Sequence, residues 1–217
     1  MGALMIQYAP LLLKGTGMSV CAWIISSCLS LTIGMLLAIA RCKQMKWLLA
    51  QRAITLYTFI AKGIPVYVHI LIVYFVIPLI IGINMPPFVA GTLALAFCSS
   101  GYVTDIISAG IDAVNEGQRQ AAFVLGYTNL QCMQRIILPQ ALSIIRPALF
   151  GECEQLLKSS SLLATIGIVE ITRAGMNIIS RELNPVPVYI MIACIYLFFS
   201  ALLCALKTYI SSKETYA

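Results

Sequence analysis

The chain has 217 residues, of which 60% are hydrophobic and only 10% are charged, and its formal net charge is +6. A water-soluble domain carries roughly a quarter charged residues, so this composition excludes a soluble globular protein and predicts an all-α integral membrane protein. The positive charges form no basic run, which argues against nucleic-acid binding.

Five segments are apolar enough and long enough to cross a bilayer, whose core of about 30 Å needs about 20 residues per helix. We predict spans at residues 18–40, 53–81, 88–109, 148–172 and 188–206, within one domain covering residues 1–217. Residues 1–17 are interpreted as an interfacial lead-in. No internal repeat is found, and an odd number of spans argues against a secondary transporter built from inverted halves.

The distribution of lysine and arginine predicts the orientation of these spans. With residues 41–52, residues 111–147 and the C-terminal tail inside, nine basic residues are cytoplasmic and three lie outside. The nine are Arg41, Lys43, Lys46, Arg52, Arg119, Arg135, Arg146, Lys207 and Lys213, and the three are Lys14, Arg173 and Arg181. The positive-inside rule therefore predicts an extracytoplasmic N-terminus and a cytoplasmic C-terminus.

Polar residues interrupt the second and third spans. Residues 62–65 read Lys-Gly-Ile-Pro, which predicts a kinked helix whose polar face avoids lipid. Two interpretations of Lys62 stay open: a side chain that reaches the interface, and a residue that lines a path. Asp105 is predicted to lie at the interface or to face the bundle, and His69, the only histidine, is predicted to be buried.

The fourth span is the most polar. It contains Glu152, Glu154, Lys158 and the triplet Ser159, Ser160 and Ser161. A charge in mid-bilayer costs about 3 kcal/mol, so these side chains are predicted to face the protein interior or a wet path. Glu154 and Lys158 are four residues apart in the order that favours an intrahelical pair. An ion pair with hydroxyls bonded to the preceding turn, and a lining of the substrate path, both remain possible functions of this segment.

Residues 111–147 lie between spans and are too polar for lipid. Gly126 predicts a left-handed helix stop, and Thr128 with Gln131 predicts a capping box that starts a second helix. Pro139 is predicted to end that helix, because proline lacks an N–H donor. Two short amphipathic helices joined at a glycine indicate a docking surface for a soluble partner.

Enzymatic and metal-binding functions find little support. The eight cysteines stand singly, without a Cys-x-x-Cys pair or a histidine cluster beside them. We therefore predict no catalytic residues and no metal ligands.

The motifs of the loop and of two spans are similar to those of ABC-importer permeases. Gln120-Ala121-Ala122, Gly126 and Leu138-Pro139 resemble the family's E-A-A loop, and Gly117 with Gln118 resembles its polar-amino-acid branch. That branch has an R-G-T-P motif, matched here by residues 62–65, and an L-L-K-D-T-S-L motif, matched by residues 156–162. Residues 166–175 also resemble the family's continuation of the fourth span.

This resemblance implies a type I ABC importer permease fold with five spans, in a bacterial inner membrane. It implies a permease subunit of an ATP-driven amino-acid importer, with residues 111–147 as a cytoplasmic loop carrying a coupling helix. The coupling residues would be Gly117, Gln118, Gln120, Ala121, Ala122, Gly126, Leu138 and Pro139. The substrate path would include Glu152, Glu154, Lys158, Ser159, Ser160 and Ser161.

The resemblance also implies contact with membrane lipid and three protein partners. They are a cytoplasmic ABC ATPase dimer, a second permease subunit that is identical or homologous, and an extracytoplasmic amino-acid-binding protein. The 217 residues contain no Walker A sequence, so ATP is expected on the ATPase subunit and no cofactor is expected on this chain.

The sequence departs from the family pattern at three positions. Gln120 replaces the acid of E-A-A, with Glu116 four residues earlier as a possible substitute, and Asn115 replaces a frequent proline. Ser159 replaces an aspartate, which favours a neutral polar amino acid such as glutamine as substrate over a cationic one. Glu152 and Glu154 keep a cationic substrate open. The alternative functions are an ABC permease for another solute, such as methionine or phosphate, and a secondary transporter.

Overall fold

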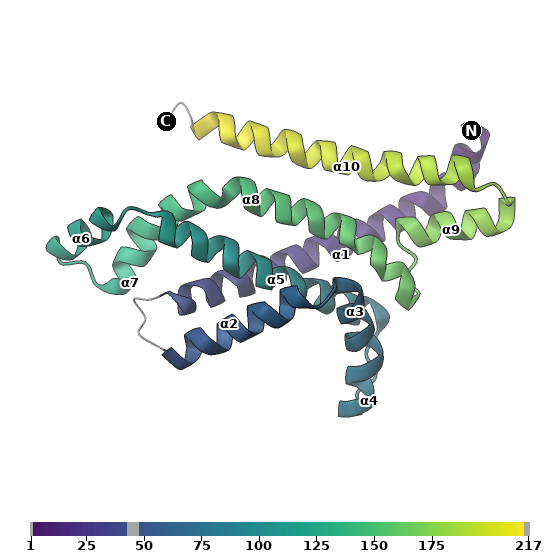
Figure 1. The fold of residues 1–217 in the computed structure, drawn as a ribbon. Helices are drawn as coiled ribbons and strands as arrows, with labels where there is room; N and C mark the ends of the chain where they lie inside the picture. The colour runs from purple at the N-terminus through teal and green to yellow at the C-terminus, as the bar shows by residue number, and fades with distance from the viewer. Residues whose placement is uncertain (1, 43–47, 215–217) are drawn as a thin grey trace. The chain divides into compact units, whose positions relative to one another are not determined.

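The computed structural model describes the backbone of residues 2–42 and 48–214, and every regular element in this part of the chain is helical. Lys43 and Lys46, which enter the predicted charge distribution, lie outside the described residues. The α-helices are α1 (Gly2–Arg41), α2 (Leu48–Gly63), α3 (Val66–Leu71), α4 (Ile77–Ile81), α5 (Pro87–Ala113), α6 (Glu116–Val124), α7 (Asn129–Cys132), α8 (Leu138–Ser159), α9 (Ile171–Glu182) and α10 (Pro185–Glu214). Two π-helical turns, η2 (Ile72–Val76) and η3 (Met133–Ile137), and the 3₁₀ helix η4 (Ser160–Ile166) complete the set (Figure 1).

Four helical segments in the described residues are long and apolar enough to cross a membrane, namely Ile6–Arg41, Pro87–Ala113, Asn129–Ile166 and Pro185–Ile210. The broken pair Leu48–Gly63 and Val66–Ile81 makes a fifth if it counts as one span. This arrangement agrees with five predicted spans. The first helix is longer than predicted, because α1 continues through Pro10 and includes the expected lead-in.

The prediction that Pro139 ends a helix was wrong. The run that starts at Asn129 continues through η3 into α8, and α8 also contains Pro147. In η3 the N–H of Leu138 bonds to the carbonyl of Met133, five residues earlier. The wide turn gives room to the ring of Pro139, which would clash with a carbonyl in a regular helix. A π turn also stands two residues before Pro78, where Ile77 N–H bonds to Ile72.

The fourth span also ends earlier than predicted. Residues 160–166 tighten into η4, and Gly167 then adopts φ 86°, a left-handed conformation that glycine takes at little cost. Residues 167–170 lead into α9, the amphipathic helix that precedes the last span.

The chain divides into two compact units, which are described separately. The first unit contains Met1–Ser27, Pro65–Leu95 and Cys153–Ala217, and the second contains Cys28–Ile64 and Ala96–Glu152. The boundaries between them fall inside helices α1, α5 and α8 and at the break between α2 and α3.

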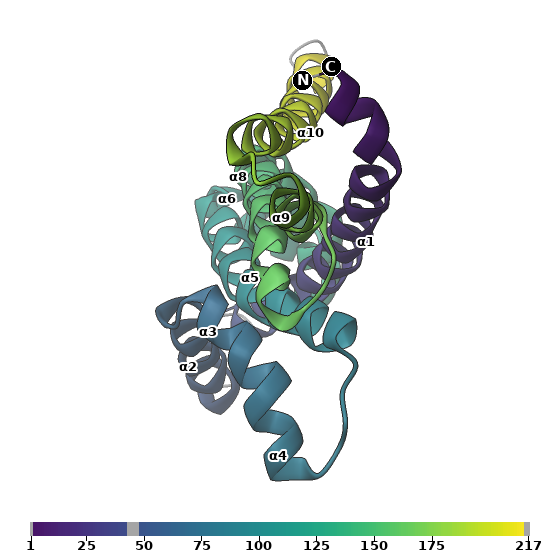
Figure 2. The ribbon, with the colours of Figure 1, turned by 90° about the vertical axis from the view of Figure 1, so that its right-hand side faces the viewer.

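Helix α9 is anchored in the first unit by a buried carboxylate. Glu170 has no exposed surface and caps the N-terminus of α9 by accepting from the N–H groups of Thr172 and Arg173, both at 2.8 Å. The hydroxyl of Tyr196, on α10, donates to the same carboxylate at 3.2 Å. A helix N-terminus stabilises a negative charge, so this buried acid is compensated. Figure 2 shows α9 beside the start of α10.

The core of the second unit joins the helix ends to the loop predicted from the sequence. Its fully buried members come from the end of α1, the second half of α5, α6, η3 and α8. They are Ala38, Val103, Ile107, Ile111, Ala122, Ile137 and Ala141, and the nearly buried Ile145 packs with them. Helices α5 and α8 approach closely at Gly110, where an added Cβ would lie 2.3 Å from Cγ2 of Ile145. Helix α6 is therefore attached to the spans through a packed apolar core.

Candidate functional site: the E-A-A loop and the polar groups of the spans

The E-A-A loop, residues 111–147, begins with a capped helix. The side chain of Asn115 accepts from the N–H of Gly117 at 2.8 Å and so starts α6. Arg119 donates to the carbonyl of Ile111 at 2.7 Å and pairs with Glu116 at 3.4 Å. Glu116 is thus engaged by Arg119, which ties the first turn of α6 to the end of α5.

The turn between α6 and α7 is as predicted. Gly126 has φ 80°, and the N–H groups of Gly126 and Tyr127 bond to the carbonyls of Phe123 and Ala122. This is the Schellman arrangement, in which a left-handed residue satisfies the last carbonyls of a helix. The predicted capping box is also present: Thr128 N–H donates to the side chain of Gln131 at 2.9 Å, and Gln131 N–H donates to Thr128 at 3.3 Å.

Four large apolar side chains between Glu116 and Cys132 are exposed. Phe123, Val124 and Leu125 end α6 with exposed fractions of 46%, 88% and 74%, and Leu130 on α7 is 54% exposed. We call these four residues the apolar tip. The neighbouring Ala122 is 1% exposed and anchors the same helix to the core. Two caps and a buried anchor therefore hold an exposed apolar surface in one conformation.

The other predicted coupling residues lie around this tip. Gly117, Gln118, Gln120 and Ala121 are exposed on α6, Leu138 is half-buried and Pro139 is exposed. Ala122 is the one member of the predicted set that belongs to the core of the second unit.

The predicted path residues of the fourth span divide between the units. In the second unit, half-buried Glu152 accepts from the hydroxyl of Ser99 on α5 at 2.7 Å. In the first unit, Lys158 and Glu154 form the predicted intrahelical ion pair at 2.7 Å. The hydroxyls of Ser160 and Ser161 donate to carbonyls three residues earlier, at 2.7 and 2.8 Å, while Ser159 is half-buried at the start of η4.

An ion cluster that the sequence did not predict lies in the second unit. Asp105 on α5 binds Nη1 of Arg41, the last residue of α1, at 2.6 Å and also accepts from Nζ of Lys62, in the last turn of α2. Asp105 is more than 40 positions from both Arg41 and Lys62 in the sequence, so no local spacing reveals the cluster. Asp105 therefore faces the bundle, one of the two predicted positions, and Lys62 is ion-paired with it. His69 is buried, as predicted.

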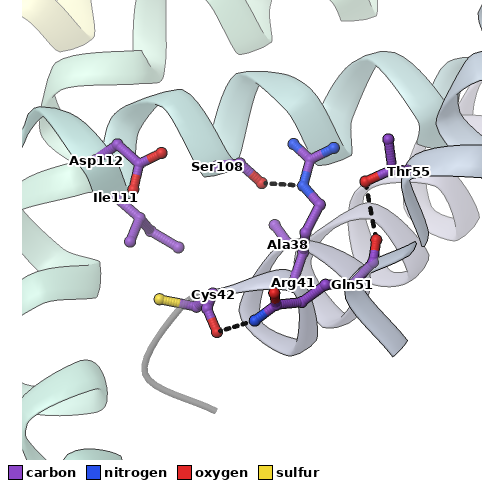
Figure 3. A pocket seen from close by; sticks show the side chains of 8 residues that line it. All are labelled: Ala38, Arg41, Cys42, Gln51, Thr55, Ser108, Ile111 and Asp112. Atoms are coloured by element: carbon purple, nitrogen blue, oxygen red, sulfur yellow. Dashed lines mark hydrogen bonds between the residues drawn. The ribbon is translucent and has the colours of Figure 1, made fainter. Parts of the chain in front are cut away.

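A pocket of about 310 Å³ lies beside this cluster (Figure 3). It is lined by Ala38, Arg41, Cys42, Gln51, Thr55, Ser108, Ile111 and Asp112. Nε of Arg41 donates to the hydroxyl of Ser108 at 3.2 Å, and Gln51 donates to the carbonyl of Cys42 at 3.4 Å. These bonds fix the end of α1 against α5 and α2.

No group of three or more histidine, cysteine, aspartate or glutamate residues in the described part of the chain could hold a metal ion. All eight cysteines lie in that part, and none forms a disulfide.

The apolar spans, the capped helices between them and the polar groups within the spans define a helical, multi-pass membrane protein. The family model described as binding-protein-dependent transport system inner membrane component matches residues 30–216. The chain therefore belongs to this family of multi-pass inner-membrane proteins.

Individual relatives place the chain more narrowly. It is similar to a putative glutamine transport system permease of Rickettsia typhi, with 34% identity over 93% of this chain and 92% of the relative. It is also similar to the arginine transport system permease of Bacillus subtilis, with 29% identity over 88% of this chain and 86% of the relative. Among solved structures, an amino acid ABC transporter with histidines has a TM-score of 0.84 and 33% identity, covering 96% of both chains.

These relatives confirm the predicted ABC importer permease fold and the predicted amino-acid branch of the family. The chain is a transport subunit of this branch, and the comparisons favour it over the alternative functions considered from the sequence.

Proposed function

We propose that this chain imports a neutral polar amino acid, with glutamine as the first candidate, and that its E-A-A loop docks on a cytoplasmic ATPase. The apolar tip carries this proposal. Exposed apolar surface outside the spans predicted from the sequence marks an interaction site, and a surface held by two caps and a buried anchor is preorganised for binding.

The distribution of basic residues supports the orientation this docking needs. Arg119, Arg135 and Arg146 lie in the E-A-A loop, whereas the segment between α8 and α10 has only Arg173 and Arg181. By the positive-inside rule the loop and the C-terminus are cytoplasmic, and the N-terminus is extracytoplasmic. An amino-acid-binding protein then delivers the substrate from outside.

The charge of Glu154 is already compensated, which favours a neutral substrate. Glu154 is paired with Lys158, while Glu152 accepts from the hydroxyl of Ser99. Ser159 supplies a hydroxyl where relatives of the polar-amino-acid branch have an acid. A hydroxyl suits an amide side chain, as a donor and an acceptor. We place Glu152, Glu154, Lys158, Ser159, Ser160 and Ser161 along the substrate path.

In this function two permease subunits, identical or homologous, bind an ATPase dimer that hydrolyses ATP. Closure of the ATPase dimer moves each E-A-A loop. The attached spans then move as rigid bodies, so that the substrate path opens alternately to the two sides of the membrane. The packed core beneath Ala122 would transmit this movement.

The test is co-expression with the cognate ATPase and binding protein, followed by co-purification and ATP-driven uptake of L-glutamine. Val124→Asp places a charge on the apolar tip, and Gln134→Asp places the same charge on an exposed polar position of the loop. We expect Val124→Asp to lose ATPase co-purification and uptake, and Gln134→Asp to keep both. Retention of both by Val124→Asp would show that the tip is not the docking surface.

A further inference from the structure

A second site is suggested by the ion cluster of the second unit, which contains more positive than negative charge. Arg41 and Lys62 both bind the single carboxylate of Asp105, so the three groups together carry a formal charge of +1. Asp105 lies within a candidate membrane span, Arg41 ends another, and Lys62 lies in the broken pair that makes a fifth if it counts as one span. An uncompensated charge in a span is costly and marks a functional group by default.

A structural cross-link does not explain the second cation. The Arg41–Asp105 pair already joins α1 to α5 and is neutral by itself. Adding Lys62 brings in a further charge without a further anion among these three groups. The carboxylate of a ligand would bring the formal charge of these three groups to zero.

The packing of α2 on α5 fixes the position of Lys62. Gly101 on α5 has no side chain, and an added Cβ would lie 2.8 Å from Cβ of Ala61 and 3.4 Å from Cγ of Lys62. The close approach of the two helices holds the stem of Lys62 against α5. Its side chain nevertheless remains 34% exposed, so its ammonium group can meet a ligand.

The exposed part of this cluster lies in a groove of about 450 Å³, within the range of small-molecule sites. We call it the Lys62 groove; it is lined by Arg41, Thr55, Thr58, Phe59, Lys62, Gly63 and Asp105. It adjoins the pocket of Figure 3, since Arg41 and Thr55 line both.

The groove offers partners for both charges of an amino acid. The Lys62 ammonium group has three hydrogens and gives one to Asp105, which leaves donors for a carboxylate. The hydroxyls of Thr55 and Thr58 donate to the carbonyls of Gln51 and Thr55. Their oxygen lone pairs, and those of Asp105, remain as acceptors for an ammonium group.

We propose that the Lys62 groove binds the backbone of the transported amino acid, with Lys62 holding its α-carboxylate beside Arg41. This inference rests on the proposed function, because it takes an amino acid as the substrate, and it assigns the recognition of the group that all amino acids share. Discrimination between side chains then belongs to other residues of the path.

The experiment uses the permease co-purified with its ATPase and reconstituted in lipid nanodiscs. Equilibrium binding of radiolabelled L-glutamine is compared with that of 4-aminobutanamide, which is glutamine without its α-carboxylate. Both are measured for the wild type, Lys62→Met, Lys62→Arg and the control Lys14→Met, whose lysine is exposed on α1 outside the groove. Lys62→Met leaves the Arg41–Asp105 pair intact and removes the excess charge, so it is expected to fold.

A charge-assisted hydrogen bond corresponds to about tenfold or more in affinity, so Lys62→Met should weaken glutamine binding by at least that factor. Lys62→Arg keeps the positive charge and N–H donors, so it should bind glutamine more tightly than Lys62→Met does and should still prefer glutamine to 4-aminobutanamide. The wild type should prefer glutamine to 4-aminobutanamide about tenfold or more, and Lys62→Met should bind the two alike. Lys14→Met should match the wild type.

A Lys62→Met protein that keeps the wild-type preference for the carboxylate overturns this inference alone, provided that the ATPase still co-purifies and glutamine still binds. If the ATPase does not co-purify with the wild type, the proposed docking is overturned instead. Absence of glutamine binding by the wild type overturns both the proposed substrate and the groove assignment.

Discussion

Leu125 at the end of α6 provides a quantitative test of the apolar tip. Its side chain is 74% exposed and makes no contribution to the buried core of the second unit. Complete burial of a leucine side chain contributes about 1.5–3 kcal/mol, so covering the exposed three quarters contributes about 1–2 kcal/mol. Leu125→Asn should therefore weaken ATPase binding about 5- to 30-fold.

A matched substitution controls for the change of residue type. Leu183, which follows α9, is 84% exposed and adopts φ 52°, where asparagine is well tolerated. Leu183→Asn makes the same chemical change outside the E-A-A loop and should leave ATPase binding unchanged. For both variants the free energy of unfolding should change by less than about 0.5 kcal/mol, as for most surface substitutions.

The assay is titration of the purified ATPase onto the permease in nanodiscs, with thermal unfolding of the permease measured in parallel. Equal ATPase affinities for Leu125→Asn and the wild type would show that Leu125 is not covered by the ATPase. So would an equal loss of affinity in Leu125→Asn and Leu183→Asn, because the effect would then not depend on the E-A-A loop.

Three further substitutions test the local structure. Gly126→Val forces a branched residue to φ 80°, which should destabilise the turn between α6 and α7 by about 1–3 kcal/mol. The displaced apolar tip should then stimulate the ATPase less in the reconstituted complex, and unchanged stimulation would contradict the left-handed turn. Thr128→Ala removes the capping box and should lower the free energy of unfolding by about 1 kcal/mol in detergent, with Thr128→Ser close to the wild type. Gly110→Ala should destabilise the protein by about 1 kcal/mol, because the added Cβ would contact Ile145. Gly151→Ala should instead stabilise it by about 0.5–1 kcal/mol, because a Cβ there would meet no side chain and no other helix within 4 Å. Equal thermal shifts of the two variants would contradict the packing of α5 on α8.

Features set by neighbouring residues were predictable from the sequence. The left-handed Gly126, the Thr128–Gln131 capping box and the Glu154–Lys158 pair each depend on spacings of four residues or fewer. Caps and i,i+4 pairs follow from helix geometry alone, so their residues carry the information.

Features that depend on distant contacts were not predictable. The Arg41–Asp105–Lys62 cluster joins three helices, and in the sequence its members appeared only as a loop charge, an isolated span charge and an interface residue. The residues around Glu170 in the sequence did not predict that it would be buried and hydrogen-bonded to Tyr196. These positions are fixed by packing, which periodicity does not encode.

The proline error has a specific physical cause. Proline breaks a regular helix through its ring and its missing donor, and Pro139 was interpreted on that basis. The π turn at Met133–Ile137 widens the helix just before it, and the same arrangement precedes Pro78. Such a π turn lets the helix continue past the proline with one irregular hydrogen bond. No residue spacing in a single sequence predicts where such a turn forms.

In the proposed function, an ATPase that docks on the apolar tip hydrolyses ATP and thereby drives amino-acid import by this chain. The most direct test is uptake of radiolabelled L-glutamine into proteoliposomes that contain the permease and ATPase, with the binding protein outside and ATP inside. The account predicts accumulation above the external concentration for the wild type and none for Val124→Asp or without the ATPase. Accumulation that persists without the ATPase, or that is undiminished in Val124→Asp, would contradict it.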